Sequence, residues 1–158
     1  RGSTDAQPTM SDPACKACIG TWPRQDHFIA DCGHAKAYLH DDQFFPGWIV
    51  LVLKRHATEL FHLSREERNS LMEEVAAVAA FLAQERQAVK INYELLGNQL
   101  PHIHWHLIPR RPQDPAPLEP VWGIAHEPVR LQPETLASVL DQLRRGWLAH
   151  MHQAPYKP

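Results

Sequence analysis

The chain has 158 residues, enough for one domain with a buried core, and its 16 basic and 18 acidic side chains nearly cancel. This balance, with no basic stripe, argues against a nucleic-acid-binding groove. No apolar stretch approaches the roughly 20 residues that cross a membrane, and no apolar segment near the N-terminus is typical of a secretory signal. We therefore expect a cytoplasmic protein that binds neither nucleic acid nor membranes.

The first residues are expected to lie outside the domain. Residues 1–3 read Arg-Gly-Ser, which is typical of a cloning remnant, and Met10 is a candidate native start. Residues 1–13 are polar, so we expect a flexible N-terminal segment there, followed by a single domain over residues 14–158.

Three strands are predicted in the first third of the chain. Residues 27–32 and residues 36–40 have the composition of short strands, with a glycine-containing turn between them. Residues 41–47 carry turn signals. Residues 48–53 form a continuous apolar run, which is typical of a central strand buried on both faces.

A long helix is predicted from Ser64 to about Gln87. Ser64 and Glu67 have the spacing of a capping box, which marks a helix start. Apolar residues at helical spacing predict one buried face, formed by Leu71, Val75, Val78 and Leu82.

Two further strands and a final helix complete the pattern. Strands are predicted over residues 89–97 and 102–108, with the second one stopped by prolines 109 and 112. Residues 109–133 contain seven prolines and are predicted to be an irregular extension. A terminal helix begins at Pro133. The order of elements predicts an α+β domain: an antiparallel sheet of about five strands, with one long helix and a C-terminal helix packed on it.

Residues 102–106 read His-Ile-His-Trp-His, the most informative run in the chain. In a strand, alternate side chains share a face, so His102, His104 and His106 would project together from an element held by its apolar opposite face. Imidazoles at this spacing suit either a metal ion or covalent catalysis with a central nucleophilic histidine. Three in strict alternation favour a site over a merely solvated strand face.

A second motif is Cys15-Lys-Ala-Cys18, which has the spacing of half a zinc site. It also fits a redox pair, although the strand-then-helix context of such pairs is missing. An odd number of cysteines without a secretion signal argues against a disulfide framework. The third, Cys32, is interpreted as a small apolar residue at a strand end.

The run from His102 to Ile108 resembles the signature of the histidine triad (HIT) superfamily of nucleotide hydrolases and transferases, in its bacterial form with Pro-His-x-His-Trp-His. The following Pro109-Arg110 and the segment from Phe45 to His56 are similar to the family as well. The resemblance covers residues 15–110 and implies a HIT-like fold.

The resemblance implies a division of roles within the run. His104 would attack the α-phosphorus of a nucleoside phosphoramidate or a dinucleoside polyphosphate and form a covalent nucleotidyl-histidine, which water then hydrolyses. His106 would contact phosphate and help to protonate the leaving group, and His102 would orient the others. Catalysis would need no metal. Members of the family often form homodimers, so a homodimer is expected.

The resemblance also implies nucleotide contacts. Asn98 lies where many members have a phosphate-binding Gln, and Gln99 lies where some have Ser or Thr. Asp41 and Asp42 lie in the region that contacts the ribose in the family, and His40 is an alternative match because the loop spacing is ambiguous by one residue.

In some members a Cys-x-x-Cys pair binds zinc together with two histidines. The corresponding set here is Cys15, Cys18, His56 and His102, which would form a closed structural site. Two alternatives stay open at this point. One is a nucleotide-binding module without catalysis, and the other is an enzyme whose metal is bound directly by the three histidines of the run.

Overall fold

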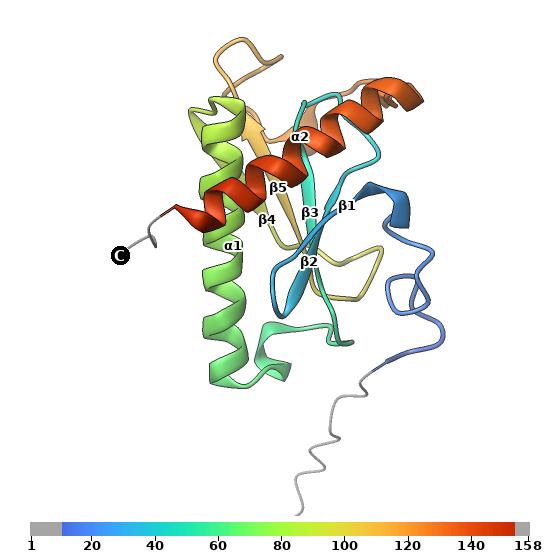
Figure 1. The fold of residues 1–158 in the computed structure, drawn as a ribbon. Coiled ribbons are helices and arrows are strands. Elements are labelled where there is room, and N and C mark those ends of the chain that lie inside the picture. Colours follow the sequence, from blue (N-terminus) through green and yellow to red (C-terminus); the bar gives the residue numbers. More distant parts are fainter. Residues whose placement is uncertain (1–10, 154–158) are drawn as a thin grey trace, which may run out of the picture.

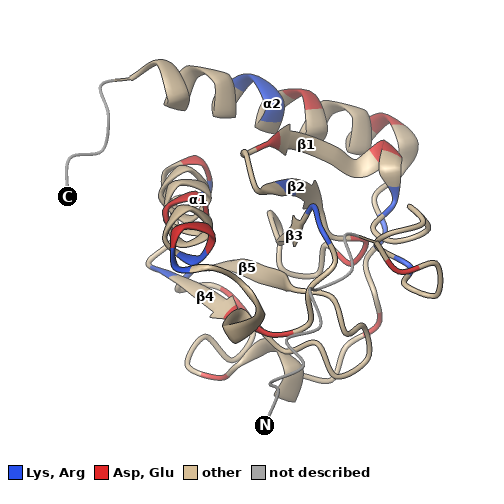
Figure 2. Cartoon of the chain, turned by 90° about the horizontal axis from the view of Figure 1, so that it is seen from below, with Lys and Arg blue, Asp and Glu red and all other residues tan. Residues whose placement is uncertain are grey.

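The computed structural model describes residues 11–153 and contains one five-stranded sheet with both long helices on the same face (Figures 1 and 2). Every neighbouring pair of strands is antiparallel, and the strand order is β1-β2-β3-β5-β4. The strands are β1 (Phe28–Asp31), β2 (Ala35–Leu39), β3 (Ile49–Leu53), β4 (Lys90–Glu94) and β5 (His104–Arg110). The predicted α+β fold and its order of elements are confirmed.

The long helices begin where the sequence predicts. Helix α1 spans Arg65–Arg86, and the Ser64 hydroxyl accepts a hydrogen bond from the backbone N–H of Glu67 at 3.1 Å. The capping box is half formed, because the Glu67 carboxylate pairs with Arg55 (2.7 Å) instead of reaching back to the helix start. Helix α2 spans Pro133–His152. Three short 3-10 helices complete the structure, namely η1 (Gln25–His27), η2 (Leu60–His62) and η3 (Val121–Gly123).

Strand β3 shows why its sequence is apolar without alternation. Ile49, Leu51 and Leu53 pack into the main core beneath the helices, whereas Val50 and Val52 pack on the opposite face with residues of the N-terminal segment. Each such side chain contributes about 1.5–3 kcal/mol on burial. Strand β3 is therefore packed on both faces, and this packing fixes the position of its neighbour β5.

Strand β5 differs from its predicted bounds at both ends. His102 lies before the strand, and Pro109 lies inside it, paired with Ile91 of β4. The carbonyl of Arg110 points towards β4, where it accepts a hydrogen bond from the backbone N–H of Val89. Because the backbone groups of successive strand residues point to opposite sides, those of Pro109 point towards β3. The pairing with β3 ends at Leu107, so the proline costs no ladder hydrogen bond there.

The Pro-rich extension is irregular, as predicted, but it is held by the buried side chain of Arg110. This guanidinium donates to Asp114 (3.3 Å), to Asn92 (2.9 Å) and to the carbonyl of Ala116 (3.1 Å), and it lies over the ring of Phe45 at 4.9 Å. An ion pair this deeply buried is tolerated because its remaining donors are satisfied. The extension therefore has a fixed course towards the sheet face opposite the helices.

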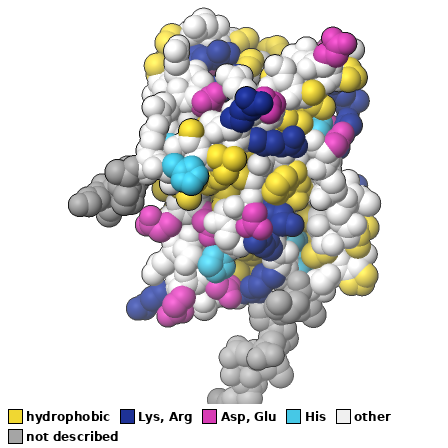
Figure 3. Space-filling view, viewed as in Figure 1, with side chains coloured by type: hydrophobic (Ala, Val, Ile, Leu, Met, Phe, Trp, Pro, Cys, Tyr) yellow, Lys and Arg dark blue, Asp and Glu magenta, His cyan; other side chains and the backbone are white. Residues whose placement is uncertain are grey.

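The surface in Figure 3 carries basic and acidic side chains interspersed with apolar ones, with no large area of one charge. None of the helices within residues 11–153 is long and apolar enough to cross a bilayer. Most of the predicted flexible segment, residues 1–10, lies outside the described residues. Within its described part, the carboxylate of Asp12 accepts from the backbone of Ala14 at 2.9 Å.

Candidate active site

A cleft of about 580 Å³ lies on the sheet face opposite the helices. Five parts of the chain line it: the N-terminal segment, the end of β2, the loop between β4 and β5, strand β5 itself and η3. The lining residues are Lys16, Trp22, His40, Leu96, Gly97, Asn98, Gln99, Leu100, His104, His106 and Trp122. Strand β5 thus presents two of the three histidines to the cleft, and its Trp105 and Leu107 pack into the core behind them.

The tautomer of His104 follows from one hydrogen bond. Its Nδ1 lies 2.7 Å from the backbone carbonyl oxygen of His102. A carbonyl only accepts, so the proton of the neutral ring is on Nδ1, and Nε2 keeps its lone pair. The ring also meets the edge of Trp22, with 5.0 Å between centroids. His104 therefore offers the cleft an unprotonated imidazole nitrogen.

His106 has the opposite arrangement. The indole Nε1–H of Trp48 donates to Nδ1 of His106 at 3.1 Å, so the ring proton is on Nε2. Burial, together with the neighbouring His104 and His40, lowers the pKa of His106 to about 3. His104 and His106 thus differ in kind within the cleft, because His104 presents a lone pair and His106 an N–H.

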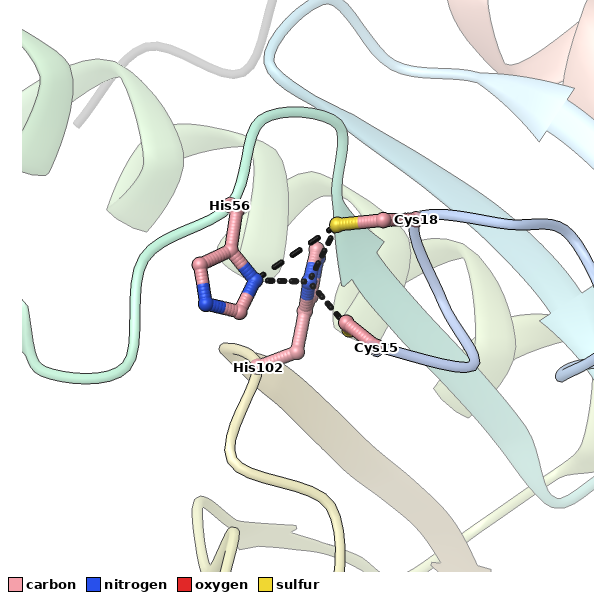
Figure 4. Close-up of side chains that lie close together, drawn as sticks. All are labelled: Cys15, Cys18, His56 and His102. Atoms are coloured by element: carbon pink, nitrogen blue, oxygen red, sulfur yellow. Dashed lines mark hydrogen bonds between the residues drawn. The ribbon is translucent and has the colours of Figure 1, made fainter. Parts of the chain in front are cut away.

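His102 faces away from this cleft and joins Cys15, Cys18 and His56 (Figure 4). Its Nδ1 lies 3.4 Å from Sγ of Cys15, 3.7 Å from Sγ of Cys18 and 3.3 Å from Nδ1 of His56. Sγ of Cys18 lies 3.5 Å from Nδ1 of His56. Tetrahedral zinc with ordinary bond lengths has S–N edges of about 3.6 Å and N–N edges of about 3.3 Å. The four residues therefore fit a tetrahedral Cys₂His₂ metal group.

The orientation of His102 also suits a ligand. Its Nε2 donates to the carbonyl of Leu53 at 2.6 Å, which leaves the lone pair on Nδ1, the nitrogen that faces both cysteines. Within residues 11–153 this is the single cluster of His, Cys, Asp and Glu that could hold a metal, and it contains neither His104 nor His106. The alternative of a metal bound by all three histidines of the run finds no support in this geometry.

Comparisons with known proteins show the family to which this fold belongs. A family model described as the HIT domain matches residues 23–113, more than half of the chain. The chain belongs to the HIT domain family. A histidine triad protein of Bradyrhizobium japonicum is 30% identical, with a TM-score of 0.69 over 77% of this chain and 92% of that one. One from Sinorhizobium meliloti is 31% identical, with a TM-score of 0.69 over 75% and 87%. One from Marinobacter aquaeolei is 30% identical, with a TM-score of 0.71 over 78% and 89%. None of the curated proteins compared with the chain matches it.

In this HIT domain the predicted nucleotide contacts divide into two groups. Asn98 and Gln99 line the cleft, but Asp41 and Asp42 do not. Asp41 lies 3.9 Å from Nε2 of His27, beside a separate hollow, and Asp42 is occupied by hydrogen bonds within the protein. His40, the alternative match, lines the cleft.

Lys16 and Trp22 line the cleft but were not predicted as site residues. The carbonyl of Lys16 accepts from the backbone N–H groups of Thr21 (3.0 Å) and Trp22 (3.2 Å), and this turn brings both side chains to the cleft. Because Lys16 lies between the two cysteines of the metal group, the same segment serves both places. A tryptophan shortly after a Cys-x-x-Cys pair was the only available hint.

His126, which had no predicted partner, fixes the segment that carries Trp122. Its Nε2 donates to Asp42 (2.6 Å), its Nδ1 donates to the carbonyl of Ile124 (2.9 Å), and its ring stacks on Phe44 at 4.0 Å. Both partners only accept, so the ring is an imidazolium. The hydrogen bond to Asp42 raises the pKa of His126. Burial acts to raise the pKa of Asp42, but the hydrogen bonds that it accepts outweigh burial and lower it.

We expect His126→Gln to lower the free energy of unfolding more at about pH 5.5 than at about pH 8.5. A raised histidine pKa gives stability that is full below its ordinary value of about 6.5 and is lost as the pH rises through the folded value. The lowered pKa of Asp42 gives stability present above about 3.9 and lost as the pH falls. Urea unfolding of both proteins measures the difference, and an equal loss at the two pH values would contradict the ion pair.

Proposed function

We propose that this HIT domain is a nucleotide hydrolase or nucleotidyl transferase. It would act on the α-phosphate of nucleoside phosphoramidates or dinucleoside polyphosphates through a covalent nucleotidyl-histidine on His104. One observation carries the proposal: the hydrogen bond from Nδ1 of His104 to the carbonyl of His102, which leaves the Nε2 lone pair as the nucleophile.

The proposed first step makes one bond and breaks one. The Nε2 lone pair of His104 attacks the α-phosphorus, and the bond to the leaving group breaks with its electron pair on the leaving atom. The ring becomes an N-phosphoryl imidazolium, and its Nδ1–H still donates to the carbonyl of His102, which stabilises the positive charge. Water then attacks phosphorus, the P–N electron pair returns to Nε2, and the proton of the water passes to solvent.

Other cleft residues support phosphate binding at this point. Lys16 supplies a positive charge, Asn98 and Gln99 supply amide donors, and His106 supplies its Nε2–H. Donors fixed before the reaction stabilise the charge that develops on the phosphoryl oxygens. Trp22 and Trp122 offer aromatic faces on which a nucleobase can stack. A binding module without catalysis would have no need for the unprotonated nitrogen of His104.

We further propose that Cys15, Cys18, His56 and His102 bind a structural zinc ion. The four distances fit the tetrahedral geometry, and all four positions are taken by protein ligands, which is typical of structural zinc. The ion would fix the turn that carries Lys16 and Trp22. It would also hold the residue whose carbonyl sets the tautomer of His104, without taking part in the chemistry.

Homodimer formation, which the family resemblance implies, stays a prediction. Strand β4 is an edge of the described sheet, and Tyr93 on it is about half exposed (48%). An open edge of this kind is a natural surface for pairing with a second copy.

We expect His104→Ala to lower kcat at least about 10³-fold on both adenosine phosphoramidate and a diadenosine polyphosphate, because it removes the nucleophile. His62→Ala, which changes an exposed histidine outside the cleft, serves as the matched control and should keep full activity. Digestion after an alkaline quench should show labelled nucleotide on the peptide that contains His104. Full activity in His104→Ala, or nucleotide binding without turnover by the unaltered protein, would contradict the proposal.

Elemental analysis should find about one zinc per chain, as a closed four-ligand site requires. Cys15→Ser should lose the metal, since it removes one of the four ligands. Cys32→Ser is the matched control and should retain it, because burial raises the pKa of the Cys32 thiol to about 12 and the residue is not part of the group. His104→Ala should also retain it. If zinc persisted in Cys15→Ser but disappeared in His104→Ala, the metal would instead be bound by the three histidines of the run, His102, His104 and His106.

A further inference from the structure

Trp48 is buried next to the cleft without lining it. The proposed nucleophilic attack by His104 does not involve this residue. Its indole N–H donates to Nδ1 of His106 at 3.1 Å, and both side chains are buried, with exposed fractions of 2% and 6%. His106 lines the cleft and Trp48 does not. Trp48 also packs against His40 and Trp122, which line the cleft, but its side-chain hydrogen bond goes to His106.

The indole is held in place on all sides. It packs with Phe45 and Ile108 in a buried cluster, and His40 stacks on it with 4.0 Å between centroids. Its backbone carbonyl accepts from the side-chain amide of Gln43 at 3.1 Å. The turn before it needs Gly47, whose φ is +94°, because a Cβ there would lie 2.9 Å from the side chain of Arg86. These contacts hold the indole N–H towards His106.

An indole N–H only donates, so Nδ1 of His106 must accept. If the His106 ring took a second proton, Nδ1 would also carry a hydrogen, and the hydrogen bond from the indole N–H of Trp48 would be lost. The other titratable groups around His106 do not favour that proton. His40 and His104 lie 5.7 and 5.2 Å away between centroids and both lower the pKa of His106, whereas Glu94, opposite on β4, is not among the groups that shift it. The low pKa of His106 agrees with a ring that stays neutral.

We propose that Trp48 is a positioning residue that holds His106 as a neutral Nε2–H donor, and that the cleft therefore cleaves nucleoside phosphate anhydrides in preference to phosphoramidates. The preference rests on the proposed nucleotidyl transfer to His104. In an anhydride the P–O bond breaks, the electron pair stays on the bridging oxygen, and the anion leaves without a proton, stabilised by the N–H of His106. In a phosphoramidate the P–N bond breaks and the nitrogen must gain a proton. Neutral His106 could supply that proton only by becoming an imidazolate.

The kinetic test compares a diadenosine polyphosphate with adenosine phosphoramidate at neutral pH. We expect the unaltered protein to favour the anhydride in kcat/KM at least about 10²-fold, the lower range of what a positioned general acid contributes. Trp48→Phe frees Nδ1 to take a proton, so the preference should fall at least about tenfold, chiefly through kcat. Trp147→Phe, a buried tryptophan in the helix-side core, is the matched control and should keep both the activity and the preference.

The spectroscopic test measures the protonation of the His106 ring directly and does not depend on turnover. In ¹⁵N-labelled protein, Nδ1 of His106 should be unprotonated and should show a coupling through the hydrogen bond to Nε1 of Trp48. The coupling should disappear in Trp48→Phe and persist in Trp122→Phe, since Trp122 touches the same ring at 5.1 Å. A proton on Nδ1 of His106 in the unaltered protein would overturn the role of Trp48, even if Trp48→Phe failed to fold.

The remaining outcomes are distinct. Equal or faster cleavage of the phosphoramidate by the unaltered protein, or an unchanged preference in a folded Trp48→Phe, would overturn the substrate preference while leaving nucleotidyl transfer in place. Turnover of neither substrate would contradict the proposed function and the preference with it, and the ¹⁵N spectrum would still support or overturn the bond between Trp48 and His106.

Discussion

The position of His102 is the constraint on which the site depends. Its ring is fixed by a hydrogen bond to the carbonyl of Leu53 and turns its other nitrogen towards the two cysteines. Its backbone carbonyl accepts from His104 and sets the tautomer of that ring. One residue thus links the end of a central strand, the candidate metal group and the proposed nucleophile. A shift of His102 would disturb all three, so the proposed zinc would support the proposed reaction through the position of this residue without taking part in it.

The rest of the fold holds this residue and its neighbours still. Strand β5 lies between β3 and β4, and its Trp105 and Leu107 pack in the helix-side core, while His104 and His106 face the cleft. His104 and His106 each have their Nδ1 in a hydrogen bond, His104 to the carbonyl of His102 and His106 from the indole of Trp48. Side chains locked in this way on a strand hold their reactive atoms more closely than loop residues would. The cleft walls, in contrast, come from loops tied by Arg110, His126 and the metal group.

The sequence predicted those features that depend on local periodicity. The continuous apolar run of β3, the capped start of α1 and the alternation in β5 each follow from a pattern within a few residues. The triad and the four metal-group residues followed from a motif resemblance, and the structure brings the metal-group residues together. Pro109 was expected to end β5, but whether a proline is tolerated depends on where the neighbouring strand ends, which is not a local property.

The nucleotide contacts were less predictable for the same reason. The resemblance placed Asp42 in the region that contacts the ribose, but its carboxylate is bonded to His126, 84 residues away in the chain. Likewise, no local pattern indicates that Trp48 would reach a histidine 58 residues later. Contacts of this kind depend on how separate segments pack, so they become visible only when the tertiary structure is known.

The most direct measurement is the ¹⁵N spectrum of His104 in histidine-labelled protein near neutral pH. If the carbonyl of His102 sets the tautomer, the ring will carry its proton on Nδ1, and Nε2 will give the resonance of an unprotonated nitrogen. A proton on Nε2 of His104 in the folded protein would leave the cleft without a nucleophile and would contradict the central claim.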